Sequence, residues 1–237
     1  MRPIPVWINP LDLFPPGDDQ APTADQTLAA MFTPGVPSDP SNVQARYRAI
    51  TANQPQLFAP PADERILNQL IWPLRHAKAC YIVGNYLATI ALAGIVAEMT
   101  AILIHDLMER SFNNRAMTPA DETRIYGRLF EELDQSRRIE VLKGYGVLTT
   151  EAADAFGRLR GTRRKHLHLA QLVDKEELSR DARAMFRDAV LVVAASIGQN
   201  VDDGKLVFTA QMMRYLERAG GSVVPPAAQP ASEKGGA

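Results

Sequence analysis

This 237-residue sequence has a single cysteine and almost no net charge. Its one cysteine, Cys80, excludes an intramolecular disulfide and any zinc site built from several cysteines. Because Cys80 lies in an apolar run, we interpret it as a small hydrophobic residue of the core. The formal net charge is −1, so the chain has no overall basic field. Binding to a nucleic acid would therefore depend on a local basic patch.

A segment suited to a signal peptide is also missing, because residues 1–7 are interrupted by prolines and contain no apolar run. Together with the single thiol, this leads us to expect a cytoplasmic protein. One segment, 79–97, has no charged residue and reaches the length of a membrane span. Gly84 and Asn85 interrupt it, and its many alanines, glycines and threonines would insert weakly. The sequence thus favours a buried bundle helix and predicts no membrane contact.

Proline divides the chain into an arm, a helical domain and a tail. Twelve of the 17 prolines lie within the first 61 residues. Proline fixes φ and removes a backbone donor, so we expect 1–61 to be a proline-rich extended arm without helix or central strand. The apolar residues within 6–14 predict that this arm contacts the folded body or a partner protein. Residues 62–222 are the predicted helical domain, and 223–237 the predicted disordered tail.

Apolar residues recur at three- and four-residue spacing through the predicted domain, which is typical of helices. We expect a first helix from Asp63 that Pro73 kinks or divides. Further helices are predicted at 74–110, from Pro119 onward, at 135–144, at 150–169, from Ser179 onward and at 209–219. The predicted fold class is all-α, an up-down bundle of about five to seven helices with an irregular N-terminal arm.

The most informative stretch of the sequence is RLRGTRRKHLHL, residues 158–169. It contains two of the four histidines, together with four arginines and one lysine. Histidine titrates near neutral pH and can therefore accept or deliver a proton. Arginine stays charged and can hold two phosphate oxygens at once. The combination favours binding or chemistry at a phosphate group, with Arg160, Arg164 and Lys165 attracting a nucleic-acid backbone.

This stretch resembles the signature of the HEPN superfamily, an arginine followed after four to six residues by a histidine near a helix end. Arg163 and His168, with four residues between them, fit the signature best. Arg160 with His166 also satisfies the spacing, so both pairings stay open. The sequence departs from the family pattern at Arg164, where catalytic members usually have asparagine or another small polar residue.

The resemblance covers roughly residues 74–198. Residues 79–98 are similar to a long helix that carries an alanine-rich face and one glutamate in many HEPN-like proteins, and here the glutamate is Glu98. Residues 138–148 are similar to the helix and turn that commonly precede the motif. Because Glu98 is flanked by apolar residues, we expect it to be a buried carboxylate paired with an arginine, first of all Arg163.

The resemblance implies a homodimer formed through the motif helix and, in active members, metal-independent cleavage of single-stranded RNA by attack of the ribose 2′-hydroxyl. Such enzymes often act as toxins or in defence. The implied roles are acid/base for His168 and phosphate clamp for Arg163, with no metal and no cofactor. His166, Arg160 and Glu98 are the supporting or alternative residues.

Two other functions fit the same residues. A non-catalytic module that binds RNA or a nucleotide would keep the basic surface without turnover. A structural, dimerising bundle would use the basic run as a solvated helix face, with His166 and His168 capping carbonyls or pairing with carboxylates. Burial of these histidines against carboxylates would favour the structural alternative.

Overall fold

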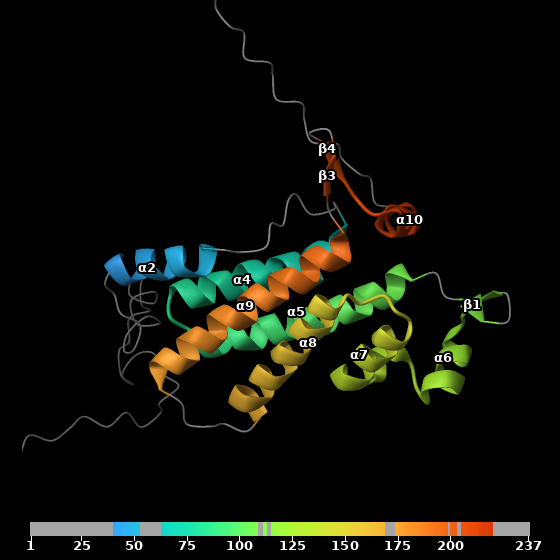
Figure 1. Cartoon of the computed structure of the whole chain (residues 1–237), viewed down its shortest axis with the longest axis horizontal. Helices are drawn as coiled ribbons and strands as arrows, with labels where there is room; N and C mark the ends of the chain where they lie inside the picture. The colour runs from blue at the N-terminus through green and yellow to red at the C-terminus, as the bar shows by residue number, and fades with distance from the viewer. Residues whose placement is uncertain are drawn as a thin grey trace, which may run out of the picture.

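The structure, a computed structural model, describes residues 40–52, 63–108, 111–112, 115–168, 174–198, 200–202 and 205–219. Over these residues the chain is all-α, which confirms the predicted fold class. Long helices form a bundle in which α9 (Lys175–Ile197) runs beside α5 (Tyr86–Leu107) (Figure 1). Two short antiparallel strand pairs accompany the helices: β1 (Ser111–Phe112) with β2 (Arg115–Ala116), and β3 (Asn200–Asp202) with β4 (Lys205–Val207).

The expectation of one helix over residues 74–110 is wrong, because the chain turns between α4 (Trp72–Ile82) and α5. Gly84 sits at the turn with φ +86°, a conformation that glycine adopts without steric cost. The side chain of Asn85 then caps α5 by accepting a hydrogen bond from Ala88 N at 3.2 Å. The two helices pack against each other after this short turn.

Helix α4 is preceded by α3 (Glu64–Ile66) and by a π-helical turn, η1 (Leu67–Ile71). Asp63 caps α3 by accepting a hydrogen bond from Ile66 N at 2.8 Å. Pro73 lacks an N–H group and leaves a carbonyl of the preceding turn without its α-helical donor. The distortion that the sequence predicts at Pro73 is therefore a wider turn within a continuous helical stretch.

The N-terminal region differs from the prediction, because α2 (Pro40–Thr51) is a helix inside the expected extended arm. Proline is compatible with the first helical position, and no proline follows until residue 55. Helix α2 packs against α4 and α9. Its Ile50 is buried in the core, and Arg46 Nε donates to Ile82 O at 2.6 Å. Residues 1–39, 53–62 and 220–237 lie outside the described residues, and so do the predicted contacts of 6–14 and the predicted tail.

Two short helices follow α5, and local signals define both. Helix α6 (Pro119–Tyr126) begins with a capping box in which Thr118 and Asp121 exchange hydrogen bonds. After the 3-10 turn η2 (Phe130–Glu132), α7 (Gln135–Gly144) has the predicted bounds. These elements were predictable because their caps lie within a few residues of the helix they start.

The motif lies at the end of α8 (Thr150–Arg163) and is followed by α9 and α10 (Ala210–Ala219). Helix α8 ends earlier than predicted and continues as a π turn, η3 (Arg164–His168). Helix α9 starts four residues before the predicted Ser179, because Asp174 accepts a hydrogen bond from Glu177 N at 2.6 Å. Helix α10 matches the predicted last helix to within one residue.

Helix α5 occupies the centre of the bundle and packs against α4, α8 and α9. Small buried residues allow these helices to approach closely: Ala93, Gly94, Ala97 and Ala101. By length and composition alone, α5 is the one helix in the described ranges that is apolar enough to cross a membrane, and half of its apolar window is buried. The core helix of a bundle has the same composition.

Candidate functional site

The candidate motif lies where α8 passes into the π turn η3, between α5 and α9. Successive residues of an α-helix are about 100° apart, so positions 163 and 168 would lie about 140° apart around an α-helical axis. A π turn joins residues five apart by its backbone hydrogen bonds. This geometry brings positions 163 and 168 close to the same side of the helix. Single π turns are frequent at functional sites.

Arg163 forms an ion pair with Glu98 of α5, which confirms the pairing predicted from the sequence. Their side chains are 25% and 28% exposed, so the pair borders solvent. The arginine side chain lies over Gly94, and a Cβ atom there would stand 2.6 Å from Arg163 Cδ. Only Nη1 donates to Glu98, and Nε has no hydrogen-bond partner in the described part of the chain. Glu98 thus fixes the guanidinium through one of its donors.

His166 and Lys165 turn toward α9, where carboxylates bind both of them. His166 Nε2 lies 2.8 Å from Asp181 Oδ2, and the imidazole is 1% exposed. Because a carboxylate only accepts, this hydrogen bond places the proton on Nε2. Lys165 Nζ donates to the same Asp181 oxygen at 2.8 Å and to Glu177. The second pairing considered from the sequence, Arg160 with His166, therefore joins an exposed residue to a buried one.

Asp181 connects His166 and Lys165, and its pKa responds to both side chains. Burial by itself raises the pKa of Asp181, but the hydrogen bonds from Lys165 and His166 outweigh it and lower the pKa below its ordinary value. The hydrogen bonds with Asp181 and Glu177 in turn raise the pKa of Lys165. Near neutral pH, Asp181 is ionised and Lys165 is charged. The charge of Lys165 is thus balanced by two carboxylates of α9, and its role in binding RNA stays a prediction.

The outer side of the motif is exposed. Arg160 and Arg164, the other two residues predicted to bind RNA, face solvent, and Leu167 is 37% exposed. Neither guanidinium has a hydrogen bond or ion pair with a described residue. His168 is the last residue of η3, and its side chain lies outside those that the structure describes.

Sequence reasoning missed Asp181, Glu177 and Gly94. Glu177 and Asp181 are four residues apart, a spacing that places two carboxylates on one helix face. That signal was available, but the predicted helix began at Ser179 and left Glu177 outside it. The role of Gly94 has no sequence signal of its own, since it depends on the crossing of α5 and α8.

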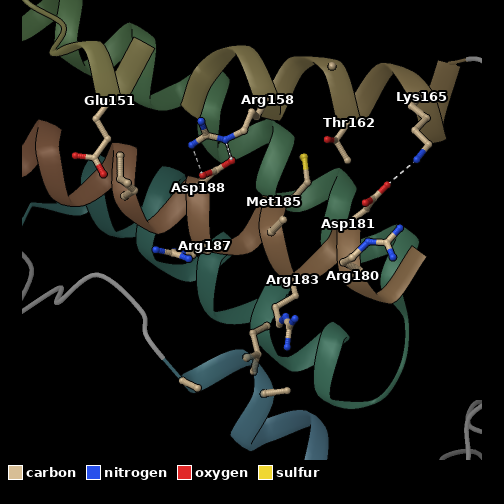
Figure 2. Close-up of a pocket in the computed structure, with 16 residues that line it drawn as sticks. Glu151, Arg158, Thr162, Lys165, Arg180, Asp181, Arg183, Met185, Arg187 and Asp188 are labelled. Carbon is tan, nitrogen blue, oxygen red and sulfur yellow. Dashed lines mark hydrogen bonds and ion pairs between the residues drawn. The ribbon is translucent and has the colours of Figure 1, made fainter. Parts of the chain in front are cut away.

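A groove of about 870 Å³ lies beside the motif, between α8 and α2, with α9 as its floor (Figure 2). Arg158 reaches across from α8 and binds Asp188 of α9 with both ends of its guanidinium, at 2.8 Å and 2.8 Å. Lys165 binds Asp181 at the other end. Arg163 and Glu98 do not line this groove. One side of α8 thus carries the Arg163–Glu98 pair, and another side faces the groove.

Elsewhere, Cys80 is a half-buried free thiol, and burial raises its pKa. The described residues contain no group of three or more histidine, cysteine, aspartate or glutamate side chains that could hold a metal ion. Comparison of the chain with protein-family models, with curated proteins and with solved structures gave no match.

Proposed function

We propose that the chain is an HEPN-like, metal-independent endoribonuclease of the toxin or defence type, acting on single-stranded RNA in the cytoplasm. The observation that carries the proposal is the π turn η3, which brings positions 163 and 168 of the motif toward one side of the helix end. Glu98 holds Arg163 at the edge of solvent beside this turn. A fixed arginine next to a histidine position suits the transfer of a phosphoryl group.

In the proposed reaction, His168 accepts the proton of the ribose 2′-hydroxyl while the 2′-oxygen attacks the adjacent phosphorus. The bond from phosphorus to the 5′-oxygen breaks, and that oxygen takes up a proton. The products are a 2′,3′-cyclic phosphate and a 5′-hydroxyl. Arg163 stabilises the charge that grows on the phosphate oxygens. Arg160 and Arg164 attract the flanking backbone.

The proposal is tested by incubating the purified protein with mixed single-stranded RNA in EDTA, beside an Arg163→Ala/His168→Ala variant. We expect fragments ending in 2′,3′-cyclic phosphate from the wild type and none from the variant. His76→Ala is the matched control, because His76 is an exposed histidine on α4. Cleavage that survives in the double variant, or that disappears in His76→Ala, would contradict the assignment.

We further propose that the active form is a homodimer through the motif helix, to which the adjoining face of α5 contributes exposed apolar side chains. Leu87 and Ile95 are 47% and 42% exposed on α5, and their spacing puts them on the side of the helix that carries Glu98. Apolar side chains exposed in a row favour association. A dimer would bring two copies of His168 to one groove, where one accepts a proton and the other delivers one.

A Leu87→Asp/Ile95→Asp variant is expected to change a dimer into a monomer, because two charges would have to be buried in the interface. Light scattering coupled to size-exclusion chromatography measures the mass. Ile125→Asp is the control, since Ile125 is 43% exposed on α6. An unchanged mass in the double variant would place the interface elsewhere.

The second candidate function is a non-catalytic dimerising bundle. The burial of His166 against Asp181 and the pairing of Lys165 with two carboxylates favour it, because both residues then stabilise the packing of η3 on α9. The same assay separates the two functions. A stable dimer that neither cleaves nor binds RNA would assign the motif to structure, whereas salt-sensitive RNA binding without cleavage would indicate a non-catalytic binding module.

A further inference from the structure

The groove between α8 and α2 contains two ion pairs, and it also contains three arginines that take part in neither of them. Arg158 is bound to Asp188 and Lys165 to Asp181, so the charges of these four residues cancel in pairs. Arg180, Arg183 and Arg187 of α9 also line the groove (Figure 2). All three side chains are exposed, and none of the three guanidinium groups has a hydrogen bond or ion pair with any residue in the described ranges. The groove therefore retains an excess of positive charge.

The spacing of the three arginines places them along one side of α9. Residues three and four apart are neighbours on a helix surface, so Arg183 stands between Arg180 and Arg187. Figure 2 shows Arg183 extending from α9 toward α2, with Arg180 and Arg187 on either side of it. Like charges held close together repel, and a multiply charged anion relieves that repulsion. Guanidinium groups also bind phosphate oxygens in pairs.

A second hollow, of about 540 Å³, adjoins the first, and Arg180 and Arg183 line both. The second hollow is walled by Tyr81, Tyr86 and Ser179, and the hydroxyl groups of Tyr81 and Ser179 lie 3.3 Å apart. Both tyrosines are largely buried, at 3% and 7% exposed, so a ligand would meet only a small part of their surface beside the arginines. The volumes of the two hollows lie in the range of small-ligand sites.

Charges at both ends of the groove limit the length of an anion that fits. Glu151 lines one end, where its charge also acts on Arg158, and Glu176 lines the second hollow at the other end. A long polyanion such as an RNA strand would pass both carboxylates and be repelled. A compact polyphosphate centred on Arg183 avoids them. The two carboxylates therefore disfavour long anions, while the arginines still attract phosphate groups.

We propose that Arg180, Arg183 and Arg187 form a binding site for a compact polyphosphate of nucleotide size, with the phosphates on the arginines and the remainder of the ligand toward Tyr81 and Ser179. The site is independent of the ribonuclease proposal, because Arg163 does not line either hollow. It also accounts for the three exposed arginines of α9 that have no ion pair with a described residue, in a chain whose net charge is −1.

The test is isothermal titration calorimetry of the full chain with ATP and with inorganic tripolyphosphate. An Arg180→Gln/Arg183→Gln variant is expected to bind both at least about ten-fold more weakly, because charge-assisted hydrogen bonds to the phosphates are lost. The control is Arg124→Gln/Arg137→Gln, which removes two exposed arginines from α6 and α7. Tighter binding of ATP than of tripolyphosphate would identify a nucleotide as the ligand, and equal binding a free polyphosphate.

Three results would overturn the site. The first is the absence of binding heat with either probe at millimolar concentration. The second is an equal affinity of the wild type and the Arg180→Gln/Arg183→Gln variant. The third is tight binding of a single-stranded RNA oligonucleotide that depends on these two arginines and that ATP does not displace. The last result would assign the groove to an extended polyanion.

Discussion

An Arg163→Lys variant is expected to fold like the wild type and to cleave RNA about 100-fold more slowly or worse. Lysine keeps the positive charge and can still pair with Glu98, so the α5–α8 contact is retained. It lacks the planar fork that holds two phosphate oxygens, and this is the interaction the proposed transition state requires. Single-turnover cleavage of a defined oligonucleotide measures the effect, and thermal unfolding checks the fold.

A substitution at Gly94 tests the position of the Arg163 side chain without changing Arg163 itself. A methyl group at Gly94 would meet Arg163 Cδ at 2.6 Å, so Gly94→Ala is expected to push the guanidinium away from Glu98 and to reduce cleavage in the same way. Gly161→Ala is the matched control, because nothing lies within 4 Å of its added Cβ. Without a clash, Gly161→Ala should stabilise the helix by about 0.5–1 kcal/mol. Full activity in Gly94→Ala would mean that the position of Arg163 does not matter.

An Asp181→Ala variant is expected to lower the free energy of unfolding by about 2–3 kcal/mol at neutral pH. The substitution removes the acceptor of two charge-assisted hydrogen bonds, one from Lys165 and one from the buried His166. His166 would then have a buried N–H without this partner. Urea denaturation at pH 7 measures the difference. Asp154→Ala, at an exposed position of α8, is the control and should change stability by less than about 0.5 kcal/mol.

The effect of Asp181→Ala should also depend on pH. Because the folded protein lowers the pKa of Asp181, the carboxylate contributes its stability above the ordinary aspartate pKa of about 3.9. The contribution is lost as the pH falls through the lower folded value. The gap between wild type and Asp181→Ala should therefore be full at pH 6 and shrink below about pH 4. A gap that stays constant down to pH 2 would show that Asp181 acts through packing alone.

Much of the fold could be predicted from the sequence because the relevant signals are local. The capping box at Thr118, the bounds of α7 and the placement of the basic motif at a helix end all depend on residues within one or two turns. The two wrong expectations about helix bounds also have local causes. Gly84 splits the predicted long helix, and a stretch without proline allows α2 to form within the expected arm.

The carboxylate partners of the motif residues depend on how the helices pack. The sequence alone determined that Glu98, a carboxylate in an apolar helix, needs a cation, because an unpaired charge is costly away from water. Its partner Arg163 is 65 residues away, and His166 is 15 residues from Asp181, so helix packing selected which carboxylate meets which side chain of the motif. Only the tertiary structure shows the π turn η3, which contacts α5 on one side and Asp181 of α9 on the other. Composition fixes which charges must be compensated, whereas only the crossing of three helices fixes the geometry of their compensation.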